Sequence, residues 1–201
     1  MRYLKLLVPA AIAATMTMAF SGAGTASASE LCTVHTNPCP SANRITKIEA
    51  SLSGGTAKFE DTSGNVLDTC TGGTMKITSI TGGAGVNPTG TVPTADLTWT
   101  GCSFPTTTTT EGTVEAPESA KGGTTIIAKK SEVTIATGVL GSCTYGFGTG
   151  LDLGEIINGG NELAINKVVK TTAGGILCPA TAVWNATYKV TNHNAVFYIK
   201  N

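Results

Sequence analysis

Apolar and polar residues alternate along much of the chain, most clearly in the stretch 178–190. Within it, every second position is apolar or aromatic, at Ala182, Trp184, Ala186, Tyr188 and Val190. Successive side chains of a β-strand point to opposite faces, so the pattern predicts a strand with one buried face and one mostly polar face. We expect Trp184 and Tyr188 to be core residues and not a platform for a ligand.

Shorter alternating runs predict further strands. They lie at 48–52, in a hairpin at 56–70 with its turn at 61–65, at 75–78, 97–102, around Val114, at 126–128, 133–135, 143–147, 151–153, 163–170 and 196–199. Such spacing, with Gly-rich turns and almost no helical period, is typical of antiparallel all-β proteins. A turn is expected at Gly72-Gly73. Because long loops at 81–94 and 117–123 interrupt the succession of strands, we expect an antiparallel β-sandwich, immunoglobulin-like or pilin-like. Little helix is expected outside the N-terminal leader.

Three segments need a separate interpretation. Thr106–Thr110 is a run of five threonines, which we interpret as an edge strand or a loop between strands in preference to an O-glycosylated or adhesive linker. Leu163–Lys170 has features of both helix and strand, and its adjacent valines and flanking glycine pairs favour a strand. Val196–Ile199 is apolar on both faces, which predicts a central or covered strand.

The N-terminus has the features of a secretory signal peptide. Arg2 and Lys5 precede an apolar stretch that is shorter than the roughly 20 residues of a membrane span, and an Ala-x-Ala site follows at Ala26–Ala28. We predict cleavage after Ala28, so that residues 1–28 are removed and 29–201 form a single secreted domain. No transmembrane anchor is expected in the processed chain.

The six cysteines all follow the predicted cleavage site. An even number of cysteines in an exported chain indicates disulfides more often than metal binding or catalysis. Six cysteines allow 15 pairings, which the sequence alone does not distinguish. We expect sequential pairing, in which each bond closes a short section of the chain: Cys32–Cys39, Cys70–Cys102 and Cys143–Cys178.

Composition argues against a nucleic-acid partner. The leader carries two basic residues and no acidic ones, so 13 minus 2 leaves 11 basic against 13 acidic residues, and a net charge of −2 after processing. The chain has no cluster of Lys or Arg with interleaved aromatic residues, which is the usual sign of nucleic-acid binding.

Catalytic and metal-binding motifs were sought and few candidates emerge. His35 and His193 are isolated from one another and from residues that would complete a zinc site or a triad. Two carboxylate pairs, Glu60 with Asp61 and Glu115 with Glu118, lack the aromatic platforms expected of a glycosidase. We expect no catalytic residues and no cofactor.

One loop has the oxygen donors of a calcium site. Asp61, Ser63 and Asn65 are weak calcium candidates, because hard oxygen ligands alternate along the loop around a glycine. A hairpin turn explains the same residues without a metal, and we favour the turn.

The chain resembles a group of small exported bacterial β-sandwich proteins. The resemblance rests on Cys-Thr-Tyr-Gly at 143–146, Cys-Pro at 178–179, the Trp-x-Ala-x-Tyr-x-Val pattern from Trp184, and Val-Phe-Tyr-Ile at 196–199. It carries no catalytic motif. Cys70 and Cys102 are also similar to the single disulfide of pilin-type immunoglobulin-like domains, although the six cysteines depart from that pattern.

These features predict a secreted, non-enzymatic structural or binding module of the bacterial envelope or exterior. Its partner would be an envelope or extracellular protein or a glycan. One alternative is a secreted hydrolase or hydrolase inhibitor with a site in the loops at 81–94 or 104–123. A second alternative is a calcium- or carbohydrate-binding module.

Overall fold

The computed structural model describes residues 28–138 and 141–200, and in these residues the protein is an antiparallel all-β structure without an α-helix. The predicted leader lies outside them, except for Ala28. The strands are β1 (Ala28–Cys32), β2 (Ile48–Leu52), β3 (Ala57–Glu60), β4 (Val66–Ala84), β5 (Val86–Val92), β6 (Leu97–Cys102), β7 (Thr106–Thr110), β8 (Gly112–Glu115), β9 (Gly123–Lys129), β10 (Glu132–Ala136), β11 (Ser142–Gly146), β12 (Leu151–Ile157), β13 (Glu162–Ala173), β14 (Thr181–Val190) and β15 (Phe197–Lys200). Two single-turn 3-10 helices, η1 (Ser41–Asn43) and η2 (Thr94–Asp96), precede β2 and β6.

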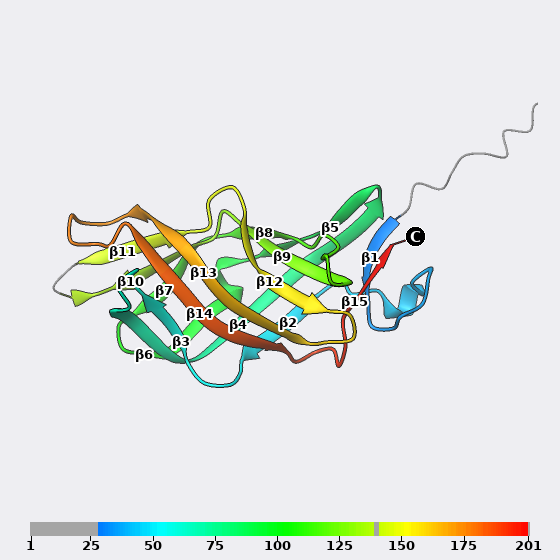
Figure 1. The fold of residues 1–201 in the computed structure, drawn as a ribbon, viewed down its shortest axis with the longest axis horizontal. Helices are drawn as coiled ribbons and strands as arrows, with labels where there is room; N and C mark the ends of the chain where they lie inside the picture. The colour runs from blue at the N-terminus through cyan, green and yellow to red at the C-terminus, as the bar shows by residue number, and fades with distance from the viewer. Residues whose placement is uncertain (1–27, 139–140, 201) are drawn as a thin grey trace, which may run out of the picture.

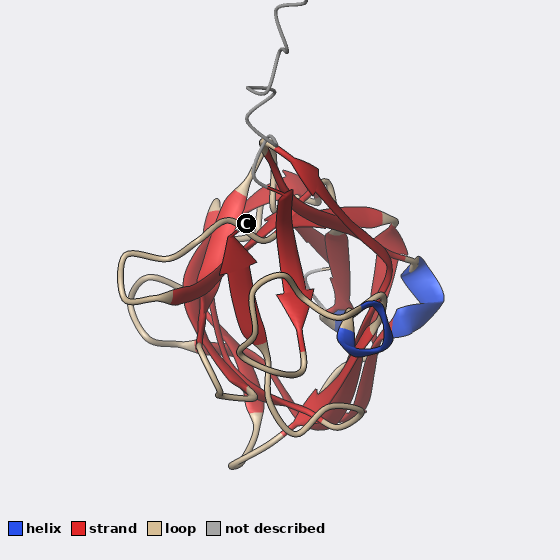
Figure 2. Cartoon of the chain, turned by 90° about the vertical axis from the view of Figure 1, so that its right-hand side faces the viewer, coloured by secondary structure: helices blue, strands red, loops and turns tan. Residues whose placement is uncertain are grey.

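The strands form one sheet that curls around an elongated core (Figures 1 and 2). The order is β12-β9-β8-β5-β4-β2-β14-β13-β11-β10-β7, with β1, β3, β6 and β15 paired beside this path. All the pairings are antiparallel, which confirms the predicted class. Strands that follow one another in the sequence often pair, as short hairpin connections require.

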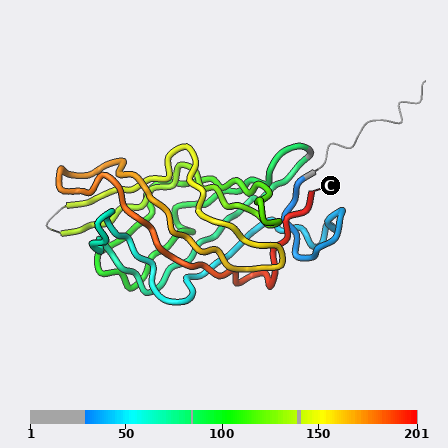
Figure 3. The backbone as a smooth tube through the Cα atoms, in the orientation of Figure 1, coloured from blue at the N-terminus to red at the C-terminus, as the bar shows by residue number. Residues whose placement is uncertain are grey.

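Strand β4 is the longest element and joins the two ends of the molecule (Figure 3). Its first part pairs with β3 and β6, and its second part pairs with β5 and β1. The register with β5 shifts after Thr78, and Ser79 there has a φ of 53°. Such a bulge bends a strand, and it lets β4 follow the curl of the sheet.

Two sequence predictions about this region are wrong. The chain does not turn at Gly72-Gly73, because both residues lie inside β4. A Cβ atom at Gly73 would lie 2.8 Å from the carbonyl oxygen of Thr98, so the glycine allows close approach of β6. Residues 81–94 are not a loop either: β4 and β5 form a hairpin through Gly85, whose φ is +70°. A glycine in a β-protein can mark a turn or a place where two backbones approach closely. The sequence pattern does not distinguish these two roles.

The core is built around the strand that shows the clearest alternation. Trp184 is 1% exposed and lies between the parallel rings of Phe59 and Phe147, with ring centroids 6.1 and 5.5 Å away. Trp99 and Tyr188 contact the same indole edge-on. The prediction that Trp184 and Tyr188 are core residues is confirmed.

The two ends of the strand order are covered. At Gly154 of β12, a Cβ atom would lie 2.6 Å from the carbonyl oxygen of Ala164 in β13, so the two strands lie against one another. At the other end β7 pairs only with β10, which confirms Thr106–Thr110 as an edge strand. Its free side faces β6, where the Thr108 hydroxyl donates to the carbonyl oxygen of Leu97 at 2.7 Å and accepts from Trp99 Nε1 at 3.2 Å.

The segments with uncertain predictions are strands. Leu163–Lys170 lies within β13, whose long ladder with β14 runs from Glu162 to Lys170. The last apolar run forms β15, which pairs with β1 and is covered rather than central. Tyr198 points into the main core, while Ile199 packs with Cys32 and Cys39 in a small second cluster. The two apolar faces of this strand therefore serve two different cores.

The structure joins the cysteines in the expected order. The pairs are Cys32–Cys39, Cys70–Cys102 and Cys143–Cys178. The first closes the N-terminal loop over β15, the second links neighbouring strands β4 and β6, and the third ties the β13–β14 connection to β11. Within the residues described, no helix has the length and apolar character that crossing a membrane requires.

Candidate ligand-binding groove

The weak calcium candidates form the hairpin turn between β3 and β4. Asp61 Oδ1 accepts hydrogen bonds from the backbone N–H groups of Ser63 and Asn65 at 2.8 and 2.9 Å. Asp61 Oδ2 accepts from Asn65 Nδ2 at 2.7 Å. These bonds, the side chain of Asn65 first, lower the pKa of Asp61. Both carboxylate oxygens are thus used by the turn, as expected for an Asx-type hairpin.

The two histidines contact different parts of the molecule. His35 stacks on Phe197 with ring centroids 5.4 Å apart, and His193 Nε2 lies 2.8 Å from the carbonyl oxygen of Lys47. Asp68 is the acidic group nearest to a pair of sulfurs, those of Cys70 and Cys102, but these sulfurs form a disulfide. The cluster therefore has no thiolate to offer a metal.

Asp68 has a structural role that the sequence analysis missed. It is 1% exposed, and its Oδ1 accepts from the N–H groups of Thr69 and Phe104 at 2.8 and 3.0 Å. Its Oδ2 accepts from the Thr106 hydroxyl. The carboxylate thereby fixes the β6–β7 connection against β4. The signal was present, because Asp68 shares the strand face of Cys70 and is charged where an apolar residue is expected.

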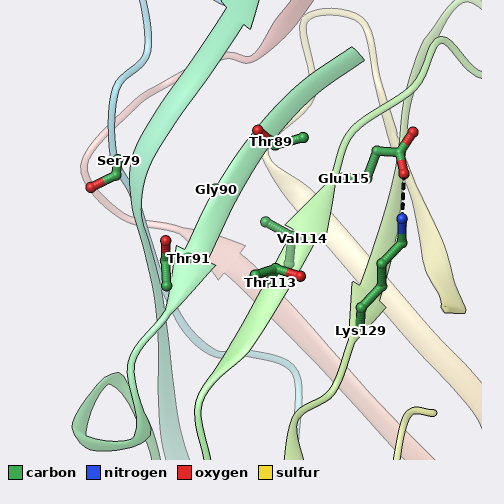
Figure 4. Close-up of a pocket in the computed structure, with 8 residues that line it drawn as sticks. All are labelled: Ser79, Thr89, Gly90, Thr91, Thr113, Val114, Glu115 and Lys129. Carbon is green, nitrogen blue, oxygen red and sulfur yellow. Dashed lines mark hydrogen bonds and ion pairs between the residues drawn. The ribbon is translucent and has the colours of Figure 1, made fainter. Parts of the chain in front are cut away.

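A concavity with a charged network lies on the outer face of β5, β8 and β9 (Figure 4). Its volume is about 280 Å³. It is lined by outward side chains of these strands, by the β4 bulge and by two buried residues at its base: Ser79, Thr89, Thr91, Thr113, Glu115 and Lys129, with Gly90 and Val114. We call it the hydroxyl groove.

Strand register brings the polar groups of the hydroxyl groove together. Thr91 lies opposite Thr113 across β5 and β8, and Thr113 lies opposite Lys129 across β8 and β9. Thr89 lies opposite Glu115 in the same way. Directly opposite residues in neighbouring strands are about 5 Å apart, so the side chains form two short rows on one rigid surface.

Glu115 is the electrostatic centre of the groove. It accepts from Lys129 Nζ at 2.6 Å and from Asn87 Nδ2 at 2.8 Å. These bonds, that of Lys129 first, lower the pKa of Glu115 from its ordinary value. The carboxylate is therefore ionised at neutral pH and presents a fixed charge pair to a ligand. Glu118 does not join it, because its carboxylate contacts Lys200 at 3.4 Å.

The β4 bulge and a buried glycine shape the groove. Ser79 is held in the left-handed region by the register shift and is exposed at one side of the hollow. Gly90 lies beneath, where a Cβ atom would be 2.6 Å from Ile77 Cγ2 and 3.1 Å from Ile80 Cγ1. A larger residue would push β5 outward and flatten the concavity.

A larger hollow of about 390 Å³ lies between the β11–β12 connection and β13. Glycine, threonine and apolar residues provide most of its lining, and Lys170 is its one charged residue. It offers fewer fixed polar groups than the hydroxyl groove, which is therefore the better candidate for specific recognition.

Four residues of the hydroxyl groove lie in segments that the sequence analysis considered for a site, but it expected those segments to be loops. Thr89 and Thr91 fall in the predicted loop at 81–94, and Thr113 and Glu115 fall in 104–123, where a loop-borne site was considered. All four are strand residues. Ser79 and Lys129 were not predicted, since only the register places them beside the others.

Comparison with protein-family models, with curated proteins and with solved structures finds no match.

Proposed function

We propose that this protein is a secreted, non-enzymatic binding module of the bacterial envelope or exterior, and that its ligand is a polyhydroxylated chain such as an envelope glycan. The observation that carries the proposal is the hydroxyl groove, where threonine hydroxyls in register surround a Glu115–Lys129 ion pair. Hydroxyl, carboxylate, ammonium and amide groups together donate to and accept from sugar hydroxyls.

Binding is favoured over catalysis by the state of Glu115. A general acid that acts near neutral pH needs a carboxyl group with a raised pKa, as in glycosidases. Lys129 and Asn87 have the opposite effect and lower the pKa of Glu115. A permanently charged carboxylate on a rigid strand positions a ligand without transferring a proton.

The proposal is tested with a glycan array followed by calorimetric titration. The probes are bacterial polysaccharides and soluble N-acetylglucosamine oligosaccharides. We expect Glu115→Gln and Lys129→Met each to weaken binding of a positive glycan by about tenfold or more, because each leaves a charged partner unpaired. Binding by the unaltered protein should not change between pH 7 and pH 5, since Glu115 remains ionised in this range.

The chain provides a matched control ion pair. Lys167 and Asp152 lie 3.2 Å apart on β13 and β12, outside the hydroxyl groove. Asp152→Asn and Lys167→Met should leave glycan binding unchanged. Absence of binding to every glycan, or equal losses from the groove and control variants, would contradict the proposal.

A further inference from the structure

Apolar side chains project into solvent at one end of the molecule. The connection between β13 and β14 reaches the end of the long axis (Figure 1, orange). Ile176 in this connection is 102% exposed and Leu177 is 59% exposed. Phe104, in the β6–β7 connection, is 38% exposed. We call these three residues the apolar tip.

The two connections belong to the same end of the sheet. Ala173 pairs with Thr144 of β11, and Ser142 pairs with Ala136 of β10. The N–H of Ala136 in turn donates to the carbonyl oxygen of Pro105, next to Phe104. Hydrogen bonds thus link the β13–β14 connection to the β6–β7 connection through β11 and β10.

The aliphatic pair is held in a defined position. The N–H of Cys178 donates to the carbonyl oxygen of Gly175 at 3.0 Å, which makes Ile176 and Leu177 the two central residues of a turn. The Cys143–Cys178 disulfide attaches this turn to β11. At Gly174 a Cβ atom would lie 2.5 Å from Cys178 Sγ, so the glycine is required for the disulfide to fit.

The stability of the fold does not explain why large aliphatic residues occupy positions 176 and 177. Central turn positions favour Gly, Asn, Asp, Pro and Ser. Here the same positions carry two large aliphatic residues that bury little of their surface on folding. An exposed aliphatic pair gains free energy only by leaving water against something else.

The segments that flank the aliphatic pair carry no charge, while Lys170 and Glu60 lie opposite Thr181 and Val183 near the start of β14. The sequence contains no Asp, Glu, Lys, Arg or His between Val133 and Leu151, or between Thr171 and Tyr188. Interfaces between proteins usually have a polar rim and anchors such as Tyr, Trp or Arg. An exposed aliphatic pair on a turn whose own flanking segments carry no charge instead suits the apolar interior of a lipid layer, where charge is strongly disfavoured.

We propose that the apolar tip inserts into the apolar region of a lipid membrane and attaches the protein to that surface reversibly. Attachment does not depend on anionic headgroups, because the turn that carries Ile176 and Leu177 contains no basic residue. Two aliphatic side chains bury few methylene groups, so the association is weak and reversible. The hydroxyl groove, on β5, β8 and β9, uses a separate set of residues and is not needed for this attachment.

The experiment is vesicle flotation with the oxidised protein that begins at Ser29. The probes are vesicles of phosphatidylcholine alone and vesicles of phosphatidylcholine with one third phosphatidylglycerol. We expect the protein to float with both kinds equally. The double variant Ile176→Ser, Leu177→Ser should reduce the vesicle-bound fraction by about tenfold, because most of the inserted apolar surface is removed.

Val86 provides the matched control. It is 58% exposed, close to the value for Leu177, but lies at the β4–β5 hairpin and outside the tip segments. Val86→Ser should float like the unaltered protein, and so should Lys129→Met, which separates this inference from the proposed glycan site. The aliphatic positions are exposed and the Lys129 side chain is partly exposed, so the variants should keep the circular dichroism spectrum and melting temperature of the unaltered protein.

Three outcomes would overturn the inference. The unaltered protein does not float with either kind of vesicle. It floats only with phosphatidylglycerol, which would indicate electrostatic adsorption. Val86→Ser loses as much binding as the tip variant, which would indicate nonspecific adhesion.

Discussion

Some buried side chains have polar atoms that form no hydrogen bond. Within the part of the chain that is described, Trp184 Nε1 and the Tyr188 hydroxyl are buried without a hydrogen-bond partner. Most buried polar groups in folded proteins have one. These two residues therefore contribute to the aromatic cluster by packing and not by hydrogen bonds.

The first prediction concerns these two residues. Tyr188→Phe should leave the free energy of unfolding at neutral pH unchanged or increase it by about 1 kcal/mol, because an unpaired hydroxyl is removed and the ring remains. Trp184→Ala should instead lower it by about 3 to 5 kcal/mol, because it opens a cavity between Phe59 and Phe147. Urea denaturation measures both. A large loss of stability in Tyr188→Phe would mean that the hydroxyl has a partner.

The same tyrosine predicts the response to alkaline pH. Burial raises the pKa of Tyr188 well above its ordinary value of 10.0, so the folded protein keeps the proton that the unfolded chain releases. Its contribution to stability is complete below pH 10 and is lost as the pH rises above this value. In Tyr188→Phe the alkaline decline should be less steep by up to about 1.4 kcal/mol per pH unit. Parallel declines in the two proteins would contradict the assignment.

Hydrogen bonds to a buried carboxylate hold one strand connection in place, and disulfides hold others. Asp68 secures the β6–β7 connection from inside, while the disulfides secure the ends of other elements. The three bonds span 7, 32 and 35 residues of sequence. In the chain-entropy account, a longer closed loop restricts the unfolded chain more.

Removal of single disulfides should follow this order. Replacing Cys32 and Cys39 by Ser should lower the free energy of unfolding by about 2.5 kcal/mol, and replacing Cys70 and Cys102, or Cys143 and Cys178, by close to 4 kcal/mol. Chemical denaturation of the three double variants measures these losses. An equal loss from all three would show that native packing around the sulfurs, and not loop length, determines their contribution.

At the scale of elements, the sequence predicted most strands and failed where glycine was involved. Alternation located β2, β3 and β14, because one face of each is apolar and a shift by one residue would expose it. Gly73 was interpreted as a turn, although the close approach of β6 requires it there. Side-chain periodicity gives no information about the distance between neighbouring backbones.

The hydroxyl groove was harder to predict from the sequence than the strands were. Ser79, Thr91, Thr113 and Lys129 come from four strands, and each is an ordinary polar residue on an outward face. Only the register brings them together, and the register of β4 with β5 shifts at Ser79. In contrast, the sequential disulfide pairing was predicted because it requires no knowledge of the register.

The whole molecule contains one main core that extends through both ends of the sheet. Strand β4 contributes Cys70 at one end and Ile80 towards the other, and both belong to the main cluster. Because the long strands cross the full core, neither end can lose its packing while the other keeps it. We expect heat to unfold the oxidised protein in a single transition with equal calorimetric and van't Hoff enthalpies. Two resolved transitions in differential scanning calorimetry would show that the ends unfold independently.

The covered ends of the strand order have a consequence for the protein at high concentration. Exchange of strands between copies, a route by which many β-proteins form swapped dimers and fibres, begins at an open edge. In this protein β12 would first have to leave β13, and β7 would have to give up the contacts of Thr108 with β6. At the two ends of the strand order, these contacts therefore oppose the exchange of strands that would begin polymerisation.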